Sequence, residues 1–206
     1  MIRLILLTTF VTLTARLQGQ QAVLVTGQNF TTYNFKDSSG QSDLTLNPQA
    51  GSFYEVAADL ELFSRGSGLY YSPSVVLNQF NAVGGNRVSL YAWKTNFLGL
   101  RQALKFNLLE NLDRFDLSVK GGASLNYMVH GVQNINGDVF NLKKDKEFNG
   151  LWIQPFAATD FLYYPVADFG VGIGYQFSKV FRLNSEAQAL NFTNHQIQFM
   201  LLVKNF

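Results

Sequence analysis

The residues from Phe115 to His130 alternate between two kinds of side chain along their whole length. Apolar or small residues occupy the odd positions, whereas most even positions carry polar or charged residues such as Asp116 and Lys120. Alternation with a period of two is typical of a β-strand with two different faces. A strand in a soluble sheet usually has about five or six residues, whereas a tilted strand that crosses a bilayer needs about ten. The length of this segment therefore favours a membrane-spanning strand.

Seven further segments carry the pattern, three of them less regularly, so the sequence predicts eight strands. The expected strands are residues 22–35, 52–63, 69–80, 88–106, 115–130, 151–164, 168–177 and 191–206. Long polar connections such as 36–51 and 131–150 alternate with short ones such as 64–68 and 165–167. This asymmetry is typical of outer-membrane barrels. We predict an all-β fold: an eight-stranded antiparallel up-and-down transmembrane β-barrel with both termini on the short-turn, periplasmic side.

A soluble β-sandwich is the main alternative, because its strands alternate too. Its outer face would carry scattered Lys and Glu, but here the polar face is rich in Gly, Ser, Asn and Gln. Charged residues make up only 15% of the chain, against roughly 25% in a typical soluble domain. Aromatic residues also gather near the strand ends, where amphipathic rings favour a membrane interface. These features favour the barrel.

Residues 1–19 are predicted to be a secretory signal peptide, and residues 20–206 the outer-membrane barrel domain. Arg3 supplies a positive start, and the apolar run Leu4–Ala15 that follows is too short to span a bilayer. A buried N-terminal helix is the alternative. No later window has enough consecutive apolar residues for a transmembrane helix. We therefore expect the chain to be secreted across the inner membrane and to reside in the outer membrane.

The composition argues against several other functions. The chain has no Cys and only two His, which removes disulfides and thiolate chemistry and makes a zinc site improbable. Its formal net charge of +2 argues against a nucleic-acid partner. We expect no cofactor and no metal.

Five stretches give the chain its resemblance to a known family. They are Gly27–Tyr33, Tyr91–Leu100, Lys120–Leu125, Gly170–Phe177 and His195–Phe199. With them the mature chain resembles the small outer-membrane β-barrel proteins of Bacteroidetes, the porin-like and PorT-like group. The resemblance implies a barrel fold and, for PorT-like members, an accessory role in protein secretion. It also implies that the terminal Phe206 is the signal read by the barrel-assembly machinery, although a register break near Asn205 is then needed.

Charged residues are expected inside the barrel. Eight strands enclose a lumen that side chains just fill. The expected strand directions point seven charged side chains inward: Asp59, Glu61, Arg101, Lys105, Asp116, Lys120 and Asp160. Four acids that meet three bases in a dry cavity should pair, because an unpaired buried charge is strongly unfavourable. We hypothesise a plug that prevents conduction. The alternatives are charges solvated at the rim, or a narrow pore for small solutes whose interior charges stay hydrated.

Catalysis is not expected. Some barrels modify lipids with a serine that a histidine activates. His130 is expected to point inward near the outer rim, but Ser124 lies six residues away, about 20 Å along a strand. His195 is expected on the outward face. Because neither histidine lies in a hydrolase motif, we predict that the protein is not an enzyme, with a lipid-modifying barrel as the third alternative.

The outer loop 131–150 is the expected contact surface. Candidate contact residues are Val139, Phe140, Leu142, Lys143 and Lys144. Apolar and basic groups on one hairpin suit a protein partner or anionic lipid head groups. A solvated loop without a partner is the alternative. The sequence thus predicts a structural or interaction protein with outer-membrane lipid as its surroundings, the barrel-assembly machinery as a partner during insertion, and further protein partners through the outer loops.

Overall fold

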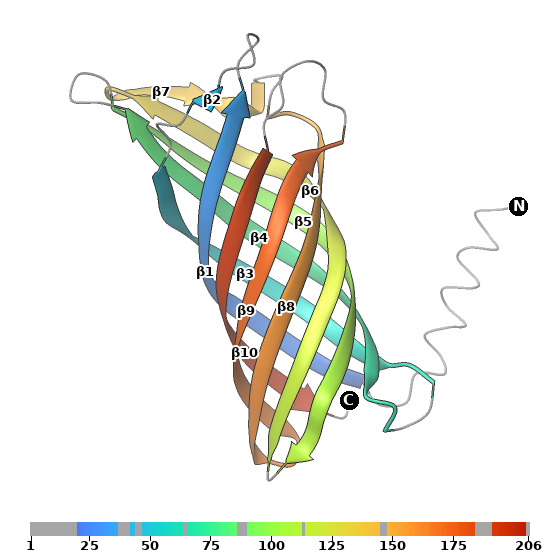
Figure 1. Ribbon diagram of the computed structural model, residues 1–206. Helices are drawn as coiled ribbons and strands as arrows, with labels where there is room; N and C mark the ends of the chain where they lie inside the picture. Colours follow the sequence, from blue (N-terminus) through green and yellow to red (C-terminus); the bar gives the residue numbers. More distant parts are fainter. Residues whose placement is uncertain are drawn as a thin grey trace, which may run out of the picture.

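The computed structural model describes residues 20–36, 42–43, 47–63, 66–85, 90–112, 114–144, 148–183 and 191–204 (Figure 1). The predicted signal peptide, residues 1–19, and the predicted assembly signal, Phe206, lie outside these ranges.

Eight long strands form the wall of a barrel. They are β1 (Gln20–Lys36), β3 (Asn47–Glu61), β4 (Leu69–Gly85), β5 (Leu90–Leu112), β6 (Phe115–Ile135), β8 (Leu151–Val166), β9 (Phe169–Arg182) and β10 (Asn191–Lys204). Each pairs antiparallel with the next, and β10 pairs with β1 from Gln21–Lys204 to Asn34–Asn191, which closes the sheet. Closure satisfies the backbone groups of every wall strand, the condition for a sheet in lipid. The predicted eight-stranded antiparallel barrel is confirmed.

The connections differ between the two ends (Figure 1). The start of β1, the end of β10 and the connections β3–β4, β5–β6 and β8–β9 lie at one end, which is the periplasmic end of an outer-membrane barrel. The opposite, extracellular end carries β2 (Ser42–Asp43), β7 (Asp138–Asn141) and the short helix η1 (Leu142–Lys144). No helix in the described part of the chain is long and apolar enough to cross a membrane.

Several strands are longer than predicted. β5 continues to Leu112 through register shifts after Asn107 and Leu109, and β6 continues to Ile135. Hydrophobic alternation marks only the part of a strand that contacts lipid, whereas backbone pairing continues into water without it. Beyond Ile135 the chain turns at Asn136 and Gly137, whose φ values are 53° and 102°, and β7 pairs back onto β6. Positive φ at both central residues is typical of a two-residue hairpin turn.

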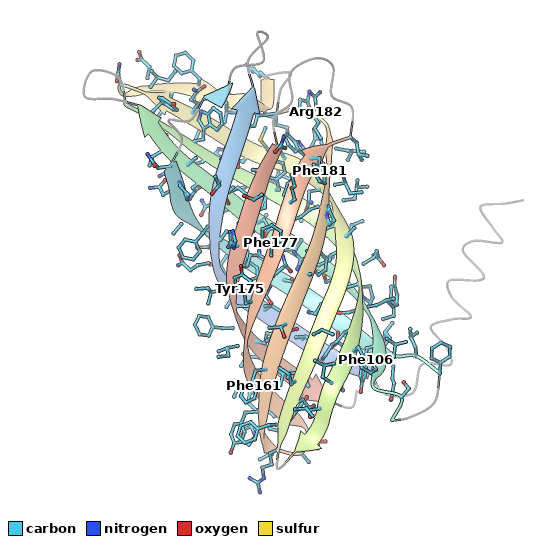
Figure 2. The ribbon with its side chains drawn as sticks, in the orientation of Figure 1. Phe106, Phe161, Tyr175, Phe177, Phe181 and Arg182 are labelled. Carbon is cyan, nitrogen blue, oxygen red and sulfur yellow. The ribbon has the colours of Figure 1, made fainter. Side chains whose placement is uncertain are left out.

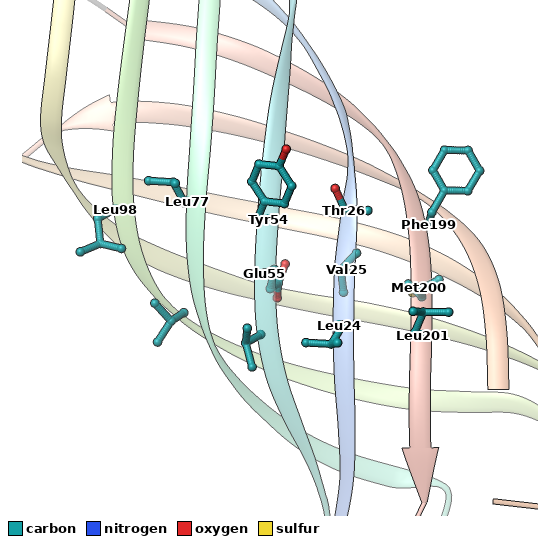
Figure 3. A pocket seen from close by; sticks show the side chains of 12 residues that line it. Leu24, Val25, Thr26, Tyr54, Glu55, Leu77, Leu98, Phe199, Met200 and Leu201 are labelled. Atoms are coloured by element: carbon teal, nitrogen blue, oxygen red, sulfur yellow. The ribbon is translucent and has the colours of Figure 1, made fainter. Parts of the chain in front are cut away.

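The outward surface of the wall is apolar. Its exposed side chains include Leu24, Val56, Leu100, Ile173 and Phe199, each on a different strand (Figure 2 shows the side chains). Residues between them point inward and are buried, so the two faces follow the alternation of the sequence. An apolar groove on this surface runs across β10, β1, β3, β4 and β5 (Figure 3). In a bilayer, lipid acyl chains cover such a surface.

Candidate functional site

The interior of the barrel is the first candidate site, and aromatic side chains close its extracellular end. This aromatic cap consists of Tyr33, Phe80, Ala82, Trp93, Phe97, Met128, Leu142, Phe148, Trp152, Val180 and Phe192. Trp152 is fully buried, with its ring centroid 5.7 Å from that of Phe97 and 5.8 Å from that of Phe192. Its indole N–H donates to the carbonyl oxygen of Phe148 at 3.2 Å. The cap thus joins the wall to the outer loop that carries Leu142 and Phe148.

Amide side chains fill the space below the cap. The amide layer consists of Asn29, Thr31, Asn78, Ser124, Asn126, Gln154, Gln176, Ser178, Asn194, Gln196 and Gln198, all buried. Six wall strands, β1, β4, β6, β8, β9 and β10, place them next to cap residues; on β1, for example, Asn29 and Thr31 precede Tyr33. Thr31 donates to Asn194 Oδ1 at 3.0 Å, and Asn194 Nδ2 donates to Asn29 Oδ1 at 3.1 Å. These bonds join the neighbouring strands β1 and β10, and Gln196 Nε2 of β10 reaches farther, to Asn78 Oδ1 of β4 at 3.0 Å. Direct hydrogen bonds thus hold the layer together.

The tightest ion pair of the interior joins Arg101 and Glu55. Arg101 Nη1 lies 2.6 Å from Glu55 Oε2, and the guanidinium stacks 4.5 Å from the ring centroid of Phe156. Ser74 donates to the other carboxylate oxygen of Glu55 at 2.6 Å, and Arg101 also donates to Gln176 Oε1 at 3.1 Å. The Arg101 residue is only 1% exposed. The two charges therefore neutralise each other out of contact with water.

Two further ion pairs lie nearer the periplasmic end. Lys105 Nζ is 2.8 Å from Asp59 Oδ2, and Ser72 donates to Asp59 Oδ1 at 2.6 Å. Lys120 Nζ is 3.4 Å from Asp160 Oδ2. The first of these pairs connects β3 with β5 past β4, and the second joins the neighbouring strands β6 and β8. Together with the tightest pair they form a charge cluster.

Apolar side chains share the periplasmic half with the charge cluster. This lower apolar cluster consists of Val23, Val25, Phe53, Ala57, Val76, Leu162, Tyr164, Met200 and Leu202. Two glycines of β9 face these clusters. A Cβ atom at Gly172 would lie 2.7 Å from the Leu162 side chain of the lower apolar cluster. A Cβ atom at Gly174 would lie 2.5 Å from Asp160 Oδ1 of the charge cluster. The glycines thus leave the room that the larger side chains of β8 occupy.

Six of the seven charges predicted inside lie in the interior: Asp59, Arg101, Lys105, Asp116, Lys120 and Asp160 are buried. Asp116 shares a hydrogen bond with Tyr164. Glu61 lies instead at the periplasmic rim, half-buried, where Oε1 accepts from the amides of Gly66 at 2.6 Å and Ser67 at 3.0 Å. The sequence-based prediction omitted Glu55. Glu55 lies four residues before Asp59 on β3, so strand alternation alone places both side chains on the inward face.

The predicted loop residues separate into two groups. Val139 is 67% exposed and Phe140 is 51% exposed on β7, and Lys143 and Lys144 are exposed on η1. Leu142 is only 2% exposed, because it packs into the aromatic cap. It anchors the outer loop to the barrel and is not available as a contact residue.

Neither histidine meets a serine. The expectation that His130 points inward is wrong. In the β5–β6 pairing Asn96 pairs with His130 and Phe97 with Met128, so Val129 is an extra residue on β6 and His130 moves to the exposed face. His195 is exposed, and its Nδ1 lies 2.6 Å from the hydroxyl of Tyr175. Ser124 is buried and donates to Gln154 at 3.2 Å. The described residues contain no group of three or more His, Cys, Asp and Glu that could hold a metal ion.

Comparison with known proteins supports the fold. No family model matches the chain, and no curated protein is significantly similar to it in sequence. Neisserial surface protein A has a similar structure, with 10% identity and a TM-score of 0.54 over 91% of this chain and 100% of that one. The chain has an outer-membrane barrel fold. With the closed wall and the apolar outer surface, this similarity gives an outer-membrane location.

Two other outer-membrane barrels align over most of their length. The outer membrane protein OprG from Pseudomonas aeruginosa is 9% identical, with a TM-score of 0.48 over 88% of this chain and 95% of that one. The outer membrane protease OmpT from Escherichia coli is 9% identical, with a TM-score of 0.48 over 92% of this chain and 98% of that one.

Proposed function

We propose that the protein is a non-conducting outer-membrane barrel with a structural or interaction role, and that it is not an enzyme. The observation that carries the proposal is the filled interior. From the extracellular end downward, the aromatic cap, the amide layer, and the charge cluster beside the lower apolar cluster occupy the lumen with buried side chains. A conducting pore needs a continuous hydrated path. Direct ion pairs at 2.6–3.4 Å argue against such a path.

The β6–β7 hairpin is the surface proposed for protein partners. Within the described residues β7 pairs with β6 alone, so its other edge carries no neighbouring strand. An unpaired edge can accept an extended segment of another protein as an added strand. Val139 and Phe140 offer apolar contacts on this edge strand, and Lys143 and Lys144 follow it. The surface therefore suits an extended, acidic segment. An accessory role in an outer-membrane or secretion complex, which the PorT-like resemblance implies, is the specific form of this proposal.

Conductance tests the sealed interior. We expect the refolded chain 20–206 to give no single-channel openings in a planar bilayer, because two apolar clusters and three ion pairs fill the lumen. Heat-modifiable gel migration shows that the inserted protein is folded. Steady openings that grow when Arg101 or Lys105 is changed to Ala would replace the sealed barrel with the narrow pore.

Site-specific photo-crosslinking in the producing cells tests the interaction role. A photoreactive amino acid at Val139 or Phe140 is expected to yield the same cross-linked protein, because both exposed side chains belong to β7. Phe161 is the matched control, an exposed aromatic residue on the outward face of β8, where lipid should be the only neighbour. A cross-linked protein from Phe161 but from neither hairpin position would contradict the assignment of the contact surface to β7.

A further inference from the structure

A hydrogen-bonded histidine and tyrosine lie on the outward surface of β9 and β10. The Tyr175 hydroxyl is 2.6 Å from His195 Nδ1, and the ring centroid of Phe177 is 5.2 Å from that of His195. Both Tyr175 and His195 are exposed to the surroundings of the barrel. Lys179, also exposed, follows two positions beyond Phe177 on β9. Figure 2 shows Tyr175 and Phe177 on this face of the wall.

The position of the pair along the barrel coincides with the edge of the membrane. A strand tilted by about 40° rises about 2.6 Å per residue along the barrel axis. His195 therefore lies about 21 Å above Val203, the lowest outward residue of β10, and Lys179 about 26 Å above Phe169 on β9. The apolar band of such barrels is about 25 Å tall. Lys179 thus lies at the level of the outer-leaflet head groups, and His195 lies about 5 Å below it, at the top of the apolar band.

The register brings the lysine and the histidine together without a paired acidic residue. Phe177 pairs with His195, and Lys179 pairs with Thr193, so Lys179 and His195 are diagonal neighbours about 7–8 Å apart at their Cα atoms. The residues paired with them on the flanking strands are Phe30 on β1, opposite His195, and, by the β8–β9 register, Pro155 opposite Lys179. None of the paired residues is a carboxylate. No side chain in these pairs neutralises either group.

The tautomer of His195 decides which group it presents, because either atom of its hydrogen bond with Tyr175 can be the donor. In the tautomer that suits an anion, the Tyr175 hydroxyl donates to Nδ1, and neutral His195 carries its proton on Nε2. Protonated His195 offers the same Nε2–H. Lys179 adds an ammonium group with three donors. With the tyrosine hydroxyl as the donor, the site presents N–H groups to an anion in either protonation state of the histidine.

We propose that Lys179 and His195 bind the phosphate group of an outer-leaflet glycolipid, as found in lipid A. The phosphate accepts hydrogen bonds from both side chains, and the acyl chains run down the wall along Tyr175, Ile173 and Ile197, whose side chains are exposed. Tyr175 is a positioning residue that orients the imidazole. The site makes the barrel selective for phosphorylated lipid at one side of its circumference. The proposal does not depend on whether the lumen conducts.

Native mass spectrometry of the folded barrel in detergent tests this site. The probes are diphosphorylated lipid A and its dephosphorylated form, which have the same acyl chains. We expect wild type to retain the phosphorylated form about tenfold more tightly than the dephosphorylated form, which is the affinity that one hydrogen bond to a charged group contributes. The variant Lys179→Gln/His195→Gln should lose this preference. Lys94→Gln is the matched control: it removes an exposed lysine of β5 that pairs with Asn81 and Val132, and should keep the preference.

The roles of the separate groups are distinguished by further measurements. Tyr175→Phe keeps both Lys179 and His195 and is expected to weaken retention of the phosphorylated lipid by a smaller factor than the double substitution. Equal retention of both lipids by wild type, or an unchanged preference in the double variant, would overturn the proposal. Displacement of the lipid by millimolar inorganic phosphate alone would also overturn it, because the site would then recognise free phosphate and not a lipid.

Discussion

Replacing Arg101 by Met alone is expected to lower the free energy of unfolding by about 3–5 kcal/mol, because the substitution leaves a buried carboxylate unpaired. Glu55 is the carboxylate concerned, and its Oε2 atom loses the ion pair with Arg101, at 2.6 Å. Ser74 still donates to Oε1, but a neutral hydroxyl does not offset the charge. The measurement is urea unfolding in lipid vesicles, followed by the heat-modifiable gel shift.

The double variant Glu55→Gln/Arg101→Met is the control for this prediction. It removes both charges and keeps side chains of similar length, and replacement of a whole buried pair is often neutral or stabilising. We expect it to recover most of the stability that Arg101→Met loses. If the single variant were as stable as wild type, water would have to reach the Glu55 carboxylate. The proposal that the interior is sealed at the charge cluster would then be wrong.

Much of the interior could be predicted because one rule governs both faces of the wall. In a closed barrel the alternate residues of a strand face either lipid or the lumen, so the position of one side chain fixes those of its neighbours. Asp116 and Lys120 illustrate this: their even positions on a regular strand sufficed to place them inside, and both are buried. The pairing partners could not be predicted, because they depend on the shear of the whole barrel. Arg101 meets Glu55, 46 residues earlier in the chain.

The errors arise where alternation is interrupted or absent. His130 changes face because of the register shift opposite Asn96. The shift belongs to the pairing of β6 with β5, so the sequence of β6 alone does not reveal it. Leu142 is buried because the outer loop folds back over the barrel mouth, an arrangement without a periodic signal. Glu61 has the expected parity, but the amides of the adjacent turn satisfy its carboxylate at the rim. Local hydrogen bonding at a strand end thus overrides the pattern.

Replacing Trp152 by Ala is expected to cost about 3–5 kcal/mol of stability, the usual cost when a large buried aromatic residue is truncated. Trp152 is fully buried between Phe97 and Phe192 and holds the carbonyl of Phe148. The same urea unfolding assay measures the loss. Trp152→Phe is the matched control: it keeps most of the apolar volume and removes the indole donor, so it should cost about 1–3 kcal/mol, the penalty of an unsatisfied buried acceptor plus a small cavity.

The same variant separates the contributions of the cap and of the deeper layers to sealing. Trp152→Ala opens a cavity at the extracellular end, but the amide layer, the three ion pairs and the lower apolar cluster remain beneath it. We therefore expect the variant to be less stable and still silent in a planar bilayer. Conductance after loss of this one ring would mean that the cap alone closes the barrel, and that the buried charges below it line a hydrated channel.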